Sequence, residues 1–281
     1  MGYTRHHLTI VNENIYSERL PAGFEDYRIV QLSDLHVGTW GEDTSFMRNL
    51  VDTVNSLEPD LIVFTGDIVN RKTDELLPFI NILSQLRARD GVFSILGNHD
   101  YGDYVDWNRP DDRKENNERL ARYENEMGWH LLNNESVWIK NRGDSILLIG
   151  VENWGDPPFP VYGDLDKAVN KEGQNDEVYK VLLSHNPEHW NREISKNTNI
   201  DLTLSGHTHA MQMMIKFGNW KWSPAKYRYE HWGGRFSRDN DKGEPTQLYV
   251  NTGTGEVGMP ARLMAAYPEI TVLTLKKGEV K

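Results

Sequence analysis

The chain has 281 residues, of which 38% are hydrophobic and 26% are charged, as is typical of a globular protein. Its 31 basic and 42 acidic residues give a net charge of −11, which argues against broad electrostatic binding to nucleic acid or anionic lipid without excluding a local positive site. Cysteine is absent, so any metal must be held by imidazole, carboxylate and amide groups rather than by thiolates.

Short apolar runs rich in β-branched residues alternate with amphipathic stretches, which predicts an α/β fold. In chain order, we expect strands at residues 27–32, 61–65, 92–96, 146–151, 179–184, 202–205, 247–251 and 270–275. Helices are expected at residues 44–57, 74–89, 116–127 and 187–195. In the first of these helices, Phe46, Leu50 and Val54 recur at helical spacing, so we expect that face to lie in the core.

Two segments interrupt the alternation, and we expect both to be loops inserted in a single domain that spans residues 1–281. Residues 101–115 are polar, and residues 216–244 are dense in Trp and Tyr. Loops of this length within a compact domain are usually functional or disordered.

The beginning of the chain leaves two interpretations open. No run approaches the roughly 18 consecutive apolar residues of a membrane-spanning helix, and the first residues lack the apolar core of a signal peptide. Met1 and Gly2 are either a native start or a cloning remnant. In the second case, a natural targeting or membrane segment upstream would be missing.

Polar side chains recur immediately after five of the predicted strands. They are Asp34 and His36, Asp67, the run Asn98-His99-Asp100, His185, and the pair His207 and His209. Because open α/β sheets bind ligands outside the carboxyl ends of their strands, these side chains would converge on one rim if the five strands share a sheet. Gly66, Gly97 and Gly206 suit tight turns that bring the backbone close to such a centre.

Seven of these side chains form a chemically coherent set of metal ligands. They are Asp34, His36, Asp67, Asn98, His185, His207 and His209. Mixed imidazole, carboxylate and amide ligation favours Zn, Fe or Mn and disfavours a site that is purely for Mg or Ca. Two such ions roughly 3.5–4 Å apart can clamp a phosphoryl group and lower the pKa of a bound water. A lone His or a single Asp at a strand end is usually structural, but five complementary motifs predict a metal centre.

The motifs resemble those of the calcineurin-like metallophosphoesterase superfamily, whose pattern is D-x-H, G-D-x-x, G-N-H-D/E, H and G-H-x-H. The matching blocks are Asp34-Leu35-His36, Gly66-Asp67-Ile68-Val69, Gly97-Asn98-His99-Asp100, His185 and Gly206-His207-Thr208-His209. Their order and spacing fit from about residue 27 to residue 275. The resemblance implies a four-layer α/β/β/α sandwich of two mixed sheets, the fold of metallo-dependent phosphatases.

The resemblance also implies how the ligands are shared between two divalent or trivalent ions of Mn, Fe or Zn. Asp34, His36 and His209 would hold one metal, Asn98, His185 and His207 would hold the other, and Asp67 would bridge them. A metal-bridging hydroxide would attack phosphorus, and His99 would act as general acid on the leaving group. Asp100 either orients His99 and raises its pKa or caps a turn; both roles remain open.

A narrower resemblance, to a bacterial membrane-associated subgroup, is carried by residues 253–255, 260–262 and 267–270. Some members of that subgroup hydrolyse a lipid-linked nucleotide sugar of the UDP-diacylglucosamine type. This implies a small-molecule or lipid-linked phosphoester substrate, and a membrane-associated bacterial protein whose N-terminal anchor is missing here. The subgroup continues G-H-T-H with Gly-Gly-Gln, whereas this chain has Ala210-Met211-Gln212, which would alter the floor of the pocket.

Aromatic and basic side chains around the predicted rim are candidates for substrate contacts. The aromatic ones are Trp154, Trp220, Trp222, Tyr227, Tyr229 and Trp232, and the basic ones are Arg109, Arg113, Arg228 and Arg235. The aromatic residues either stack on a base or sugar, cover an acyl chain, or form a small satellite core. Each Arg either pairs with a second phosphate or is an ordinary surface residue.

Three functions compete at this stage. The first is phosphoester hydrolysis. The second is a non-catalytic binding module of the same fold, which loss of a ligand or of the acid would indicate, but all eight positions are kept. The third is a nuclease, against which the net charge and the lack of a basic stripe argue.

Overall fold

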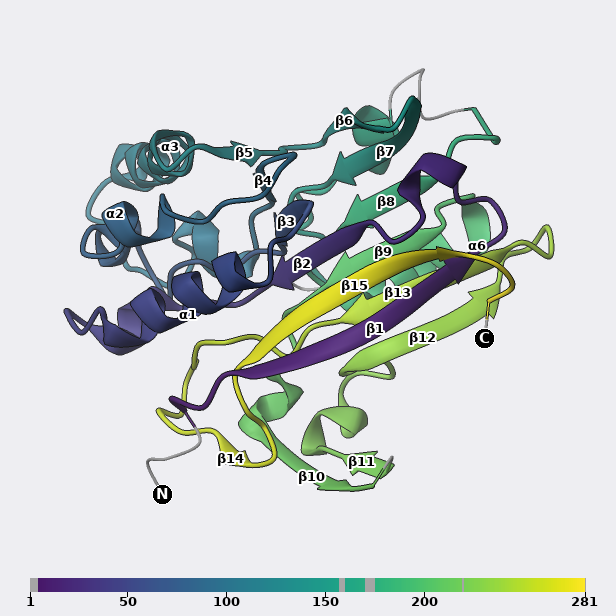
Figure 1. Cartoon of the computed structure of the whole chain (residues 1–281). Coiled ribbons are helices and arrows are strands. Elements are labelled where there is room, and N and C mark those ends of the chain that lie inside the picture. Colours follow the sequence, from purple (N-terminus) through teal and green to yellow (C-terminus); the bar gives the residue numbers. More distant parts are fainter. Residues whose placement is uncertain (1–4, 157–159, 170–174, 219, 281) are drawn as a thin grey trace.

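Two six-stranded sheets form the centre of the molecule (Figure 1). The computed structural model describes residues 5–156, 160–169, 175–218 and 220–280. The strand order of the first sheet is β1 (Thr9–Ser17), β15 (Glu269–Lys277), β2 (Arg28–Leu32), β3 (Leu61–Phe64), β4 (Val92–Ser94) and β5 (Trp129–Leu131). The order of the second is β12 (Gly234–Asp239), β13 (Pro245–Val250), β9 (Leu202–Ser205), β8 (Lys180–Leu183), β7 (Asp144–Gly150) and β6 (Glu135–Asn141).

Both sheets are mixed. In the first, the neighbours from β2 to β5 run parallel, β15 runs antiparallel to β2, and β1 runs parallel to β15. In the second, β13, β9, β8 and β7 run parallel, and the edge strands β12 and β6 run antiparallel to their neighbours.

Alternating side chains divide the apolar core into layers, because successive residues of a strand point to opposite faces. Ile29, Leu61 and Val63 pack between the two sheets. Their neighbours Val30 and Ile62 face the opposite way, into a cluster with the helices that cover the first sheet. A third cluster lies on the outer face of the second sheet. The predicted four-layer α/β/β/α sandwich is therefore confirmed.

Helices cover the outer face of each sheet. The first sheet is covered by α1 (Ser45–Ser56), α2 (Ile80–Leu83) and α3 (Pro110–Glu126). The second is covered by α4 (Leu165–Val169) and by a continuous helical stretch made of α5 (Pro187–His189), the π-helical turn Trp190–Ile194 and α6 (Ser195–Asn197). Among the described residues, no helix is both long and apolar enough to cross a bilayer.

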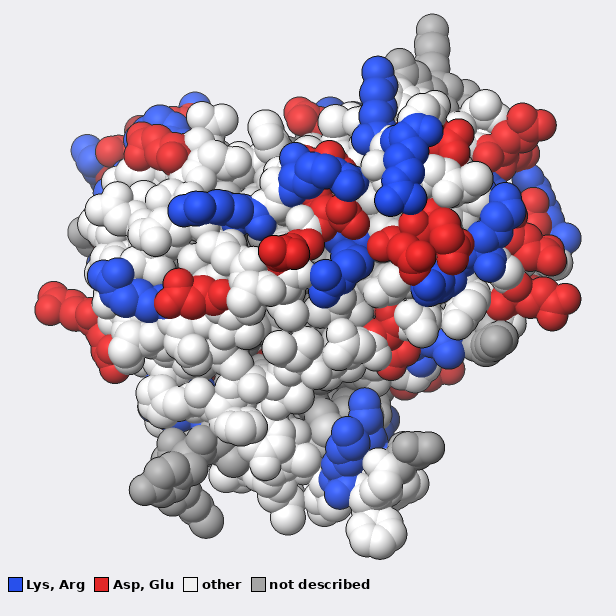
Figure 2. Space-filling view, viewed as in Figure 1, with Lys and Arg blue, Asp and Glu red and all other residues white. Residues whose placement is uncertain are grey.

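A small third sheet lies at one end of the molecule, at the bottom of Figure 1. Its order is β11 (Trp220–Trp222), β10 (Met213–Phe217) and β14 (Leu263–Met264). In Figure 2 the surface over β10 and β11 is white and blue without red, whereas acidic and basic side chains mix over the upper part of the molecule.

The eight predicted strands are all present, with ends shifted by at most two residues. The five strands that precede the candidate ligands do not share one sheet, since β2, β3 and β4 lie in the first sheet and β8 and β9 in the second, as the two facing sheets of the resembled fold imply. The helix predicted over 74–89 is wrong. Only the 3-10 turn Thr73–Leu76 and α2 form there, because Pro78 between them lacks an N–H group.

The two segments predicted as loops contain regular structure. α3 begins at Pro110, inside the segment 101–115, and the segment 216–244 includes the end of β10, all of β11 and β12. Residue 219 of that segment and the first four residues of the chain, on which two interpretations were left open, lie outside the described residues.

Candidate metal centre

The carboxyl ends of five strands from the two sheets meet, and they bring the candidate ligands together. Four of these, Asp34, His36, Asp67 and His209, offer ligand atoms that all lie within 4.8 Å of one another. A second group within the same distance consists of Asp67, His185 and His207. All of them are buried except the partly exposed His207.

Asp67 belongs to both groups, and one of its oxygens lies between them. Its Oδ2 is 3.5 Å from Nε2 of His36 and 3.2 Å from Nε2 of His185. The other oxygen, Oδ1, accepts a hydrogen bond of 2.8 Å from the backbone N–H of His99. The carboxylate is thus positioned to bridge two ions.

Each group has the dimensions of a site for one ion. In the first, Nε2 of His209 is 3.1 Å from Oδ1 of Asp34 and 3.1 Å from Nε2 of His36. In the second, Nε2 of His185 is 3.2 Å from Nδ1 of His207 and 3.2 Å from Oδ1 of Asn98. Ring nitrogens this close attract each other only when a proton or a cation lies between them, and ligands about 2.0–2.2 Å from one ion are spaced in this way.

Hydrogen bonds on the far side of each ligand fix which atom faces the centre. Nδ1 of His36 lies 3.1 Å from the carbonyl of Val69, and Nδ1 of His185 lies 2.7 Å from the carbonyl of Thr65. Because a ring N–H donates to each carbonyl, both residues present Nε2 with its lone pair.

In the second group, the hydroxyl groups of two tyrosines fix which atom of each ligand faces the centre. The Tyr104 hydroxyl accepts a 2.8 Å bond from Nδ2 of Asn98, so the amide oxygen faces His185. The Tyr229 hydroxyl lies 3.0 Å from Nε2 of His207, which leaves Nδ1 for the centre.

The backbone at the centre is held in an unusual conformation. Asp34, His36, Asp67, His207 and His209, five of the seven candidate ligands, have left-handed φ angles between 41° and 73°. Non-glycine residues in this region cost about 1–3 kcal/mol each and are found where the surrounding structure enforces them, often at functional sites.

Glycines allow the loops to approach one another, as predicted. A Cβ atom at Gly206 would overlap the side chains of Ser33 and Asp34, and one at Gly66 would lie 2.5 Å from the backbone nitrogen of Gly97. Gly66 also has a φ of +95°, which glycine adopts without strain.

The electrostatics suit cation binding. Burial lowers the pKa of His36 and of His207 to about 3, so both are neutral near pH 7, the form that binds metal. Burial raises the pKa of Asp34 and Asp67, but neighbouring histidines, His209 for Asp34 and His185 for Asp67, outweigh it and hold both below the usual range. Burial lowers the pKa of His185, but Asp67 and Asp34 raise it to about 9, so a cation there would displace a proton.

Of the two roles left open for Asp100, its contacts support the turn cap, because its carboxylate bonds to backbone N–H groups rather than to the imidazole of His99. Its two oxygens accept hydrogen bonds from the backbone N–H groups of Asp67, Ile68, Val69 and Gly97, at 2.8–3.2 Å. The ring of His99 is held instead by the carbonyl of Asn70, 2.6 Å from Nδ1, and it stacks on Tyr104. Asp100 therefore has the role of a turn cap, which here shapes the loop that carries Asp67.

The sequence did not identify Asn70 or Tyr104 as residues of the centre. It named Tyr229 as a candidate substrate contact but not as a contact to a metal ligand. Asn70 comes directly after the motif Gly66-Asp67-Ile68-Val69, so its proximity was a usable signal. Tyr104 and Tyr229 come from the two segments predicted as loops, and nothing in the sequence pairs them with Asn98 and His207.

The aromatic candidates divide between core and surface. Trp154 is buried and stacks on His189 at a ring distance of 5.3 Å, and Trp232 packs against the small cluster around Met214. By contrast, Trp220 and Tyr227 are exposed.

The basic candidates are paired with carboxylates. Arg109 pairs with Asp112, Arg113 with Asp103, Arg235 with Glu13 and Arg228 with Asp156. Of these four, only Arg228 lines the cavity beside the candidate metal centre.

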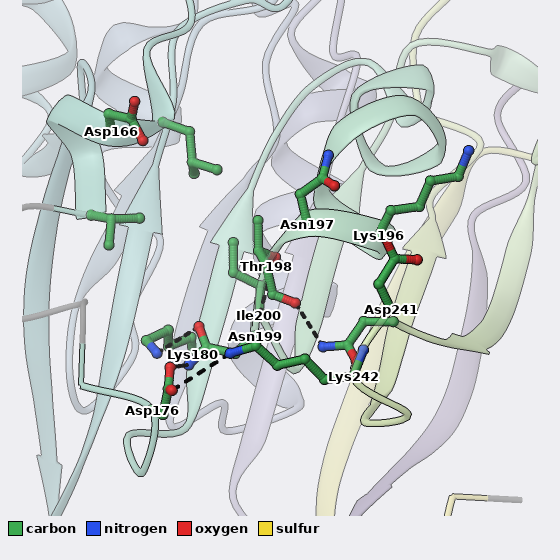
Figure 3. Close-up of a pocket in the computed structure, with 13 residues that line it drawn as sticks. Asp166, Asp176, Lys180, Lys196, Asn197, Thr198, Asn199, Ile200, Asp241 and Lys242 are labelled. Carbon is green, nitrogen blue, oxygen red and sulfur yellow. Dashed lines mark hydrogen bonds and ion pairs between the residues drawn. The ribbon is translucent and has the colours of Figure 1, made fainter.

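That cavity has a volume of about 250 Å³ and opens beside the second group of ligands. It is lined by Asn98, Tyr104, Asn153, Gly155, Asp156, Asn186, His207, Arg228 and Tyr229. A larger cavity of about 830 Å³ lies at the amino ends of β8 and β9, where Lys180, Thr198 and Asp241 line it (Figure 3). Because parallel strands carry their ligand sites at the opposite ends, the larger cavity is separate from the metal centre.

Comparison with known proteins agrees with this geometry. Residues 27–211 match the family model for calcineurin-like phosphoesterases. The metallophosphoesterase YkuE of Bacillus subtilis is 30% identical, with 98% of this chain and 89% of the relative covered. The UDP-2,3-diacylglucosamine pyrophosphatase LpxG of Chlamydia muridarum is 29% identical, with 91% of this chain and 86% of the relative covered.

A relative from Danio rerio, a transmembrane protein with a metallophosphoesterase domain, is 30% identical over 95% of this chain. The chain spans only 57% of that relative's length. Among solved structures, the NAD nucleotidase of Haemophilus influenzae superimposes with a TM-score of 0.53 at 14% identity, covering 81% of this chain and 50% of that one, a likeness of fold alone. With a family model that covers about two thirds of its length, the chain belongs to the calcineurin-like phosphoesterase family and is a hydrolase of phosphoric esters.

Proposed function

We propose that this hydrolase works with two transition-metal ions bound side by side. Asp34, His36 and His209 would hold one ion, Asn98, His185 and His207 would hold the other, and Asp67 would bridge them. The observation that carries the proposal is the position of Asp67 Oδ2, which lies within 3.5 Å of a ligand nitrogen from each group. Imidazole and carboxylate donors together suit Mn, Fe or Zn.

When bound, two such ions would polarise the phosphoryl group and supply an activated water. The chain's own residues would position the substrate and handle the leaving group. The Nδ1–H group of His99 donates to the carbonyl of Asn70, so Nε2 is the atom able to carry a proton to a leaving oxygen. Asp100 would act only as a positioning residue, through the backbone it caps.

The cavity of about 250 Å³ would hold the part of the substrate beyond the phosphoryl group. Its lining of amide and tyrosine side chains, with one Arg paired to Asp156, suits a compact polar group rather than a nucleic-acid strand. We therefore propose a small-molecule or lipid-linked phosphoester as substrate.

A second candidate is hydrolysis of a pyrophosphate in a lipid-linked nucleotide sugar. It is supported by the similarity to the UDP-2,3-diacylglucosamine pyrophosphatase, which spans nearly the whole of both chains. The relative described as a transmembrane protein supports a membrane-associated setting for either reaction.

Elemental analysis and turnover together test the main proposal. We expect close to two equivalents of transition metal per chain, and loss of both from an Asp67→Ala variant because both groups share that carboxylate. A panel of phosphomonoesters, phosphodiesters and pyrophosphate-linked nucleotides, assayed with added Mn, would separate the two candidate reactions. A chain that binds one ion, or that hydrolyses none of these with metal restored, would contradict the proposal.

His99 is tested separately by its replacement with alanine. Because its imidazole lies outside both ligand groups, His99→Ala should keep the metal and lose about 10²–10⁴-fold in turnover on substrates with poor leaving groups. The loss should be smaller on an activated aryl ester, which needs no protonation of its leaving oxygen. The exposed His130→Ala serves as control. Equal losses on both substrates would mean that His99 positions the phosphate instead.

A further inference from the structure

The hairpin of β10 and β11 carries an apolar face. Phe217 lies directly opposite Trp220, and Ile215 lies opposite Trp222, so these four side chains share one face of the small sheet. Met213 and its neighbour Leu263 on β14 continue that face. Phe217 is 83% exposed and Trp220 is 57% exposed.

This face has no partner in the core. None of its six residues belongs to, or packs against, any of the four hydrophobic clusters formed by the described residues. The opposite face does have one, since Met214 packs with Ala210 and Ala266. The sheet is therefore attached to the molecule by one side, and on its other, apolar side Phe217 and Trp220 are exposed while the remaining four side chains are half-buried.

Exposed apolar side chains are concentrated here. Ten large hydrophobic side chains are exposed among the described residues, and six of them come from residues 206–229 and 257–268. The six are Met211, Phe217, Trp220, Tyr227, Met259 and Met264. Of these six, Phe217 and Trp220 lie directly opposite each other on the open face of the hairpin, and a paired exposed Phe and Trp is more than the scattered single apolar residue of an ordinary surface.

The charge of the same two segments is opposite to that of the whole chain. Neither 206–229 nor 257–268 contains a single Asp or Glu, although the chain has 42 acidic residues. Lys216, Lys221 and Lys226 are exposed, and no ion pair joins any of them to a carboxylate of a described residue. Unpaired lysines beside exposed Trp, Tyr and Phe are the composition of an interfacial membrane anchor.

We propose that this face docks on a membrane surface that contains anionic lipid. The aromatic side chains would enter the region between headgroups and acyl chains, and the lysines would meet the lipid phosphates. A second copy of the chain fits less well, because six side chains fall short of the roughly 20–30 residues a side of a stable interface. Lys216 and Lys221 pair with each other on the other face of the hairpin, where they can reach the level of the lipid phosphates when the apolar face is inserted.

Docking would bring the metal centre to the membrane. The hairpin follows His209 by only four residues, and Ser223 Oγ donates a 2.6 Å bond to the carbonyl of Ala210, which ties the end of β11 to the ligand loop. The inference does not depend on the metal chemistry, because membrane binding is measured without turnover.

Vesicle flotation tests the proposal with the whole chain. We expect binding to vesicles of phosphatidylcholine with 30% phosphatidylglycerol, binding that weakens as salt rises, and little binding to phosphatidylcholine alone. Phe217→Ala combined with Trp220→Ala, and separately Lys216→Glu combined with Lys221→Glu, should each lower the partition coefficient by about tenfold or more. Hydrolysis of a soluble aryl phosphate should stay unchanged in both variants.

Matched variants separate this surface from general effects. Leu77→Ala combined with Val161→Ala removes two apolar side chains that are about half exposed elsewhere on the surface, and Lys140→Glu reverses an exposed charge on β6. None of these should change vesicle binding. The proposal would be overturned by a lack of binding to anionic vesicles or by equal binding to both kinds of vesicle. It would also be overturned if the chain forms a dimer that Phe217→Ala combined with Trp220→Ala dissociates, with no change in lipid binding.

Discussion

Several ionisable side chains of this molecule are buried away from solvent, and Glu124 on α3 is one that lies outside the metal centre. Its side chain is fully buried, and Ser94 Oγ donates to one carboxyl oxygen. The other oxygen has no hydrogen-bond partner among the described residues. Burial raises the pKa of Glu124 to about 8, so the neutral acid is the favoured form in the folded chain.

This carboxyl group should make stability fall as the pH rises. Because the folded pKa of about 8 exceeds the ordinary value of 4.5, its contribution is complete below pH 4.5 and is lost as the pH rises through about 8. Glu124→Gln keeps the shape without the charge, so it should unfold at higher urea than the parent chain at pH 8.5. The gain in free energy of unfolding should be about 2–4 kcal/mol and should shrink towards pH 5.

Glu126 on the same helix is exposed, so Glu126→Gln is the control and should change the free energy of unfolding little at any pH. If the free energy of unfolding changes with pH in the same way in the parent chain and in Glu124→Gln, then Glu124 is already ionised without cost in the folded chain.

Among the helices and strands, those defined by local pattern were predicted and those defined by tertiary contacts were not. Strand β3 is a continuous apolar run and β8 is one after its first residue, Lys180, because both faces of each strand are covered, and such runs are visible in the sequence. β1 alternates in burial and carries several polar residues, so it reads as a strand only once β15 lies beside it. The end of β10 and the whole of β11 lie in the segment 216–244, which was predicted as a loop because it is dense in Trp and Tyr and interrupts the alternation of strands and helices.

The same distinction applies to the candidate metal centre. The grouping of Asp34, His36 and Asp67 was predictable, because ligands in short motifs at strand ends must meet at the edge of the sheets. The partners that orient them were not, because Tyr104 and Tyr229 reach the centre through the folding of long segments. The sequence left Asp100 with two possible roles, because only its neighbour His99 was known, whereas the structure shows that its carboxylate bonds to the backbone of the loop that carries Asp67.

Tyr229, which follows the 3-10 turn Pro224–Tyr227, can be tested as a residue that orients a metal ligand. Tyr229→Phe removes the hydroxyl that lies 3.0 Å from Nε2 of His207 and should weaken metal binding to the second group about 10–100-fold, with less effect on the first. Metal competition titrations on the parent chain and on Tyr229→Phe measure the affinity of each group. Tyr227→Phe, two residues away and 78% exposed, is the matched control and should leave both affinities unchanged. A uniform loss at both groups would indicate a disturbed fold rather than a lost orienting bond.

On the scale of the whole molecule, the metal centre joins the two sheets. Asp34, Asp67 and Asn98 follow strands of the first sheet, and His185 and His207 follow strands of the second. Ions shared between them would cross-link the layers in addition to the apolar contacts between the sheets.

Chelation should therefore lower the melting temperature of the whole chain. An ion that binds only the folded state stabilises it by mass action, by about 2.7 kcal/mol for each site at a free concentration of 100 times Kd. Calorimetry before and after chelation should show a single transition that moves down and returns when Mn is added. The Asp67→Ala variant should melt near the chelated parent chain and respond little to chelator. An unchanged melting temperature would mean that the ions do not couple the layers.

The left-handed backbone at five of the candidate ligands bears on the order of events when the chain folds. At about 1–3 kcal/mol each, these conformations are too costly to form in an isolated loop, and they exist only after the strands on either side have paired. The ions would accordingly enter a finished site instead of nucleating the fold. Metal uptake would then be a separate second-order step whose rate depends on ion concentration, while the folding rate does not.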